Sequence, residues 1–131
     1  EILIYEIDKK NVGFCGVSFK PNTDDLRNSS LIMTINNLLE KKNSYQTAFN
    51  INIIDNPYVL KQLENKQSRS LLLTTEIDNF IDKSQIIILG PYEIKNKYIQ
   101  KMVKMNKTII DLKWHKIDSK IKDYENYISF V

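Results

Sequence analysis

Residues 12–30 read VGFCGVSFKPNTDDLRNSS, and this stretch changes character halfway along. Its first part is an apolar run with two glycines, which is typical of a buried strand. Its second part is rich in Asn, Thr, Asp and Ser, the residues that form turns and cap helices. Lys20 and Arg27 stand in this polar part. The stretch therefore predicts a strand, a loop with two cations and a helix start, and ligands of open α/β sheets bind at such a place.

Strand and helix patterns alternate along the rest of the chain. Apolar segments predict strands at 11–17, 51–55, 71–73, 85–89, 107–112 and 127–131. Segments between them predict helices at 28–42, 76–83 and 93–105, and a short helix starting at 56–57. We expect Asn28 or Ser29 to cap the first helix and Thr75 to cap the helix at 76–83. This alternation predicts an α/β fold with one doubly wound parallel sheet, residues 11–17 near its centre, in a single domain.

The composition limits the classes of protein and partner. A chain of 131 residues fits one domain, and 42% hydrophobic residues suffice for a core. There are 19 basic and 16 acidic residues, and the net charge of +3 is too mild and too scattered to indicate a nucleic-acid partner. No apolar run approaches the roughly 20 residues that cross a membrane.

Cys15 is the single cysteine, so the chain holds no internal disulfide. This fits a reducing compartment, and we expect a cytoplasmic protein. Because Cys15 lies in an apolar strand, where burial raises the pKa of a thiol, it is interpreted as a core residue and not as a nucleophile.

The sequence lacks several signatures of catalysis. Gly13 and Gly16 do not form a G-x-G-x-x-G loop, and we expect them to allow close packing of a neighbouring element. No P-loop, no nucleophile beside a base and no metal-ligand spacing occurs. Thr23, Asp24 and Asp25 resemble a metal cluster, but two adjacent carboxylates without a third ligand favour caps and turns. The pattern indicates a binding domain and not a complete catalyst.

Three residues of the loop suit a nucleotide. The ring of Phe19 is suited to packing on a base or sugar, and the ammonium of Lys20 to phosphate oxygens. Two interpretations of Arg27 stay open: it contacts a ligand, or it pairs with Asp24 or Asp25 and fixes the loop.

Lys113 follows the strand at 107–112, and its loop is expected at the same sheet edge as the loop with Lys20. Both cations would then reach one anionic ligand. The alternative is a solvated surface lysine. Trp114 and His115 follow, and no carboxylate partner of His115 is indicated by spacing.

Residues 16–27, GVSFKPNTDDLR, resemble the opening of the C-terminal domain of nucleotide-sugar 6-dehydrogenases, which act on UDP-glucose, GDP-mannose or UDP-N-acetylmannosamine. The likeness continues at 53–58 and 78–89, and at 109–113, where IIDLK is similar to a closing strand that commonly ends Asp-Gly-Arg. The resemblance implies a Rossmann-like domain over residues 11–131 that binds the nucleotide half of a UDP- or GDP-linked sugar. Residues 1–10 would be a linker or the end of a preceding element.

The resemblance also implies roles for single residues. Phe19 and Lys20 match residues that contact the sugar nucleotide, and Arg27 matches an arginine that reaches NAD. Lys113 stands where many members place an arginine against the substrate, so the charge is kept but the planar fork is lost. The family's catalytic cysteine and NAD fingerprint belong to preceding domains, so we expect no catalytic and no metal-binding residue in this chain.

By the same resemblance, the parent protein would oxidise a sugar alcohol to a uronic acid in two NAD-dependent steps, for polysaccharide biosynthesis. NAD would be bound mainly by the N-terminal domain, and the parent would be a homo-oligomer without nucleic-acid or membrane partners. This chain alone would be inactive. Two alternatives remain open: a stand-alone nucleotide-binding or regulatory domain, and a receiver-like signalling domain. The second needs a phosphoacceptor Asp at the end of the third strand, where Thr74 and Thr75 stand instead.

Overall fold

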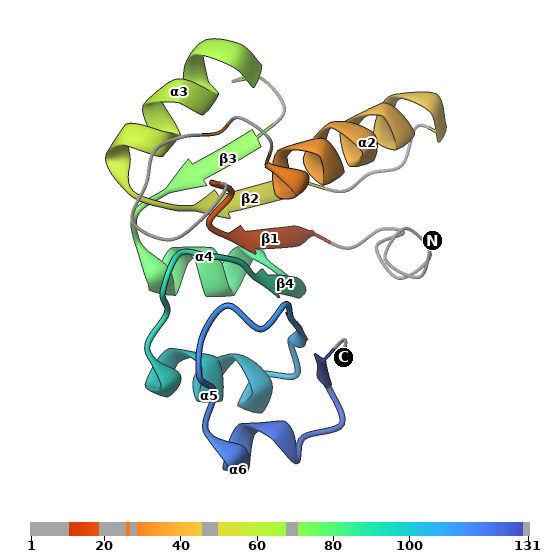
Figure 1. The fold of residues 1–131 in the computed structure, drawn as a ribbon. Coiled ribbons are helices and arrows are strands. Elements are labelled where there is room, and N and C mark those ends of the chain that lie inside the picture. The colour runs from red at the N-terminus through yellow and green to blue at the C-terminus, as the bar shows by residue number, and fades with distance from the viewer. Residues whose placement is uncertain (1–10, 19–25, 27–28, 46–49, 68–70, 130–131) are drawn as a thin grey trace.

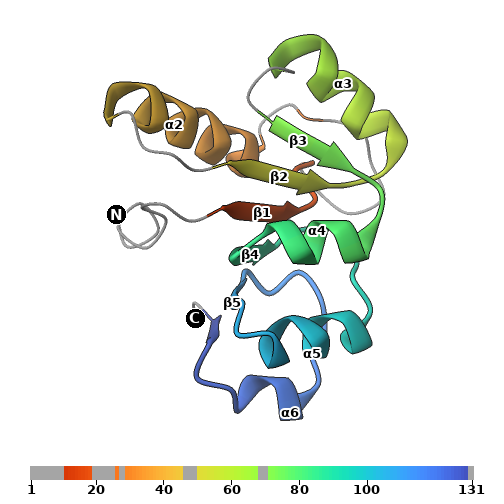
Figure 2. The same cartoon turned by 180° about the vertical axis from the view of Figure 1, so that it is seen from behind.

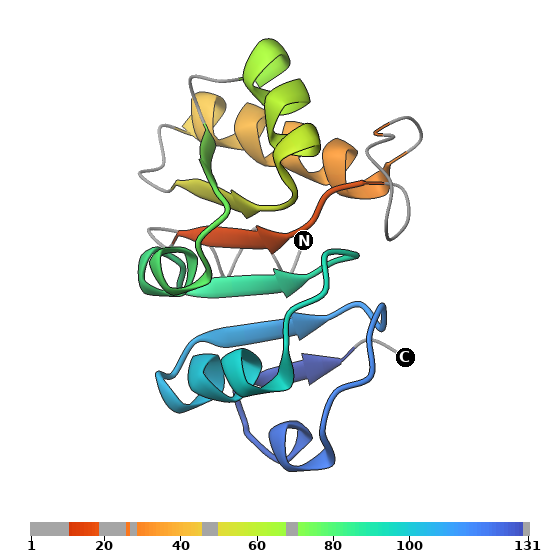
Figure 3. The ribbon, with the colours of Figure 1, turned by 90° about the vertical axis from the view of Figure 1, so that its left-hand side faces the viewer.

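The fold is built on one parallel sheet. The computed structural model describes residues 11–18, 26, 29–45, 50–67 and 71–129, and within them six strands lie in the order β3-β2-β1-β4-β5-β6. All neighbouring strands are parallel, so their arrows point the same way in Figure 3. The strands are β1 (Val12–Cys15), β2 (Ile51–Ile54), β3 (Leu71–Thr74), β4 (Ile86–Leu89), β5 (Thr108–Asp111) and β6 (Tyr127–Ser129). The predicted parallel sheet with residues 11–17 at its centre is confirmed.

Helices cover both faces of the sheet, as Figures 1 and 2 show. Two of them, α2 (Ser30–Tyr45) and α3 (Pro57–Gln67), pack on one face. The other face carries α4 (Ile77–Lys83), α5 (Asn96–Lys104) and α6 (Ser119–Lys122). The order of strands and the two helical layers are those of a Rossmann-like doubly wound fold.

The side chains of the central strands alternate between two cores. Val12 and Phe14 of β1 point into the core beneath α2 and α3, whereas Cys15 points into the core beneath α4 and α5. Cys15 is fully buried and has no disulfide partner, and burial raises the pKa of its thiol far above the ordinary value. The interpretation of Cys15 as a core residue is confirmed.

Side chains cap α2 and α3, whereas α4, α5 and α6 begin without a side-chain cap. The hydroxyl of Ser29 accepts a hydrogen bond from the amide of Ile32 at 3.2 Å, so Ser29 caps α2 as expected. Thr75 was the wrong cap for α4: that helix begins after Glu76, and the hydroxyl of Thr74 accepts the amide of Glu76 at 3.0 Å. The helix predicted from residue 93 begins later, because residues 90–95 form a loop. The short helix α6 was not predicted.

Candidate functional site

The candidate site lies along the carboxyl edge of the sheet. The strand order reverses between β1 and β4, and in open α/β sheets the ligand crevice lies at that switch point. Among the described residues, 16–18, 90–95 and 112–118 follow β1, β4 and β5 at this edge (Figure 3). Phe19, Lys20 and Arg27 lie outside the described residues, as do Thr23–Asp25.

Glycines bring the segments after β1 and β4 into close contact. Gly16 has a φ of +87°, and a Cβ placed on it would lie 2.4 Å from the amide nitrogen of Tyr92. A Cβ on Gly90 would lie 2.7 Å from the carbonyl oxygen of Gly16. The amide of Tyr92 also donates to the carbonyl of Cys15 at 3.2 Å. Only residues without a Cβ allow this approach, so the segment after β4 is locked onto the end of β1.

Gly13 serves a different contact, on the face that carries α4. A Cβ there would lie 2.6 Å from the ring of Phe80 and 2.5 Å from the hydroxyl oxygen of Ser84. The expectation that Gly13 and Gly16 allow close packing is therefore confirmed. Both glycines pack closely against other residues of this chain.

The carboxylate of Asp55 anchors the beginning of the loop after β1. Its Oδ2 accepts the amide of Val17 at 3.0 Å and its Oδ1 accepts the amide of Asn56 at 2.7 Å. Asp55 is only 3% exposed, and burial raises the pKa of its carboxyl although the two amide donors lower it. The hydroxyl of Ser29 donates to the carbonyl of Val17, so both ends of the segment with Lys20 are fixed.

A second buried carboxylate shapes the end of β5. Asp111 is 4% exposed, and its Oδ1 accepts the amide of Lys113 at 2.7 Å. The hydroxyl of Tyr127 donates to its Oδ2. Lys113 itself is exposed and has a φ of +65°. The predicted position of Lys113 at the carboxyl edge is thus found, on a turn held by Asp111.

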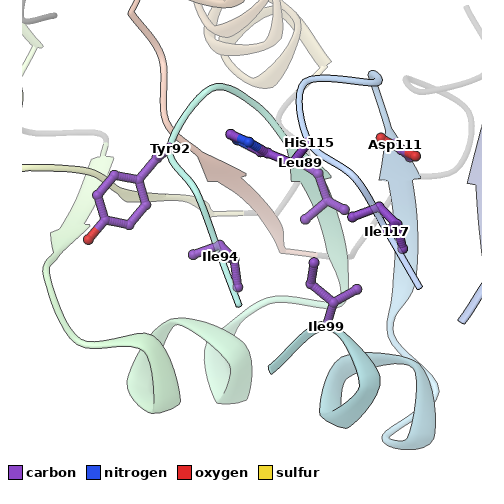
Figure 4. Close-up of a pocket in the computed structure, with 7 residues that line it drawn as sticks. All are labelled: Leu89, Tyr92, Ile94, Ile99, Asp111, His115 and Ile117. Carbon is purple, nitrogen blue, oxygen red and sulfur yellow. The ribbon is translucent and has the colours of Figure 1, made fainter. Parts of the chain in front are cut away.

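Beside this turn, His115 joins the loops after β4 and β5. Its Nε2 lies 3.1 Å from the carbonyl oxygen of Pro91. Since a carbonyl only accepts, the Nε2 proton is in this contact. Figure 4 shows His115 above a pocket walled largely by Leu89, Ile94, Ile99 and Ile117. The pocket has no volume that a water molecule would occupy, so it belongs to the core and holds no ligand.

Sequence reasoning missed Asp55, Asp111 and Tyr127 as parts of this edge. The two aspartates each follow an apolar strand, and that position was the available signal. Tyr127 carried no comparable signal. In the described part of the chain no group of His, Cys, Asp or Glu is placed to hold a metal ion, and no helix there is long and apolar enough to cross a membrane.

Comparison with known proteins places this edge in a family. A profile described as the UDP binding domain of the UDP-glucose/GDP-mannose dehydrogenase family matches residues 13–117, from the second residue of β1 to the segment that follows β5. The chain belongs to this family. It corresponds to the family's UDP-binding domain, and the resemblance inferred from residues 16–27 is confirmed.

Individual family members agree. GDP-mannose 6-dehydrogenases of Pseudomonas savastanoi pv. phaseolicola and Pseudomonas syringae pv. tomato are each 30% identical over 119 residues, covering 84% of this chain and 26% of the relative. The chain thus spans about a quarter of the length of these relatives.

Two solved structures share the fold of this UDP-binding domain. GDP-mannose dehydrogenase of Pseudomonas aeruginosa, solved as a ternary complex, has a TM-score of 0.62 at 22% identity, over 97% of this chain and 29% of that one. UDP-glucose dehydrogenase of Pyrobaculum islandicum has a TM-score of 0.64 at 19% identity, over 97% and 27%.

Proposed function

We propose that this UDP-binding domain, spanning residues 11–131, holds the nucleotide half of a UDP- or GDP-linked sugar in an NAD-dependent nucleotide-sugar 6-dehydrogenase. The observation that carries the proposal is the family match over residues 13–117, because it includes every described loop at the carboxyl edge of the sheet. Residues 1–10 would link the domain to a preceding element of the same polypeptide.

Residues around the switch point between β1 and β4 would contact the substrate. Phe19 and Lys20 follow β1 and would contact the sugar nucleotide, and Lys113 follows β5, two strands away, and would reach the same diphosphate from there. A diphosphate suits this edge because charge-assisted hydrogen bonds to ammonium groups are among the stronger ones in proteins. Arg27 would extend toward NAD held by another domain. None of these residues carries out bond making.

The described residues do not fit NAD as a resident cofactor of this domain. The glycines at β1 contact Phe80, Ser84 and Tyr92, so they serve internal packing and not the approach of a pyrophosphate. We therefore assign the NAD cradle, and the cysteine of the family reaction, to preceding domains. Bound there, NAD would supply the hydride-acceptor chemistry of the family reaction, and no residue of this chain would take part in that transfer.

The wider setting follows from the same assignment. Uronic-acid nucleotides are building blocks of acidic polysaccharides, so the enzyme would supply polysaccharide biosynthesis. We also place the enzyme in the cytoplasm, where NAD and nucleotide sugars are available, as a homo-oligomer.

The proposal is tested by activity and by binding. The full gene product, incubated with NAD and GDP-mannose or UDP-glucose, should form NADH, whereas the 131-residue chain alone should form none. Calorimetric titration should show binding of GDP-mannose or UDP-glucose to the full gene product. A gene product that binds none of UDP-glucose, GDP-mannose and UDP-N-acetylmannosamine, or an isolated chain that forms NADH, would contradict the proposal.

A further inference from the structure

Tyr127 and Lys113 are connected through one buried carboxylate. Asp111 ends β5, and its two oxygens have different partners: the amide of Lys113 at 2.7 Å and the hydroxyl of Tyr127. A buried carboxylate is costly unless donors satisfy it, so the two contacts hold Asp111 in one orientation. The oxygen that accepts the amide of Lys113 is therefore held in a fixed position.

The bond from Asp111 to Lys113 sets how the chain leaves β5. An aspartate that accepts the amide two residues ahead forms an Asx-turn, which mimics a backbone turn. Lys113 adopts a φ of +65°, a conformation that residues other than glycine rarely adopt. Since the carboxylate of Asp111 holds the amide of Lys113 in this turn, the direction of the exposed Lys113 side chain depends on that carboxylate.

Tyr127 reaches Asp111 from a separate strand. Tyr127 of β6 pairs with Ile109 of β5, so it lies diagonally opposite Asp111 on the same face of the sheet. It is half-buried, and burial together with the bond to Asp111 raises the pKa of its hydroxyl. The hydroxyl therefore stays protonated and donates to the carboxylate throughout the neutral range.

We propose that Tyr127 is a positioning residue for the nucleotide diphosphate: by holding Asp111 it fixes the turn that directs the Lys113 ammonium toward the phosphates. This inference rests on the proposed function, because it requires Lys113 to contact the substrate nucleotide. It assigns a role in substrate affinity to the last strand of the domain, which lies beyond residues 13–117.

A purely structural alternative exists: the bond between Tyr127 and Asp111 would only hold β6 against β5. The two roles predict different effects when the residue at position 113 is changed. A structural tie lowers stability whatever residue stands at 113. A positioning contact changes nucleotide affinity only while the lysine is present.

The experiment is a double-mutant cycle in the full gene product, titrated calorimetrically with GDP and with UDP. Tyr127→Phe removes one hydroxyl and should weaken affinity about three- to tenfold, from a net hydrogen bond of ordinary strength. Lys113→Ala should weaken it about tenfold, and Tyr127→Phe should then add nothing. Tyr124→Phe is the matched control, since Tyr124 packs on the same core while the carboxylate of Asp111 is bonded to Lys113 and Tyr127; it should bind like the wild type.

A second readout needs no ligand. The amide of Lys113 should exchange with solvent faster in Tyr127→Phe than in the wild type or in Tyr124→Phe, because its acceptor is no longer held. If Tyr127→Phe does not fold, Asp111→Asn replaces it in the cycle, since the amide keeps the size of the carboxyl but loses its charge.

The outcomes separate the two claims. If the wild-type full gene product binds neither GDP nor UDP and the exchange of the Lys113 amide responds as expected, the turn geometry stands but the proposed function fails, and the role in binding fails with it. If the wild type binds and Lys113→Ala weakens binding while Tyr127→Phe does not, only the positioning role is overturned. An equal effect of Tyr127→Phe with and without Lys113 also overturns it.

Discussion

The amide nitrogen of Val17 lies 3.0 Å from Oδ2 of Asp55, although 38 residues separate them in the chain. This bond joins the end of β2 to the first residues beyond β1, where the segment with Lys20 begins. The same carboxylate accepts the amide of Asn56, so one buried group fixes two turns at the carboxyl edge. Asp55 therefore fixes the backbone at the two points where the chain leaves β1 and β2.

Asp55→Ala should lower the free energy of unfolding by about 2 kcal/mol or more. The substitution leaves the buried amide of Val17 without its acceptor, and an unsatisfied buried group costs about 1–3 kcal/mol. Chemical denaturation measures the change. Asp118→Ala is the control, because Asp118 is exposed and its side chain makes no cap hydrogen bond. Equal stability of the two variants would contradict the anchoring role of Asp55.

The raised pKa of Asp55 predicts a pH dependence of stability. In the unfolded chain the carboxyl titrates near its ordinary pKa of about 3.9, and in the folded protein at a higher pH because of burial. Between the two pKa values the folded state binds more protons, so the stabilising contribution falls as pH rises. The difference in unfolding free energy between wild type and Asp55→Asn, measured by denaturation from pH 3 upward, should therefore decline. A difference that grows with pH in this window would be contrary to the burial argument.

Gly16→Ala should destabilise the domain by at least about 2 kcal/mol. The alanine would hold a φ of +87°, and its methyl group would meet the backbone of Tyr92, which has no flexible end to yield. Thermal unfolding measures the loss. Asn37→Ala, at an exposed position of α2, changes stability little or raises it. Wild-type stability of Gly16→Ala would show that the contact with Tyr92 is not tight.

Much of the fold is predictable because its signals are local. The run of Ile86 to Leu89 is apolar and bounded by Gly90-Pro91, and Pro57 stands at a helix start, so β4 and α3 follow from sequence. The four residues of α6 are too few for a helical period to show. Ile94 is apolar and buried, but it lies in the loop before α5. Its apolar character made the predicted helix begin too early.

The candidate site is less predictable for a physical reason. Asp55 with Val17, and Asp111 with Tyr127, are pairs brought together by tertiary structure, and neither spacing nor composition indicates which donor a buried carboxylate accepts. Lys113 was found because its position after a strand is a local property. Phe19, Lys20 and Arg27 lie outside the described residues, and their roles stay predictions.

Calorimetric titration of Lys20→Ala, in the full-length dehydrogenase, tests the central claim most directly. A charge-assisted hydrogen bond contributes about 1.5–3 kcal/mol, so affinity for GDP-mannose or UDP-glucose should fall roughly ten- to a hundredfold. Affinity for NAD should change much less, because we assign its cradle to another domain, and the thermal midpoint should stay near that of the wild type. Unchanged affinity for both sugar nucleotides together with a collapse of thermal stability would make Lys20 a structural residue and contradict the assignment of the nucleotide site.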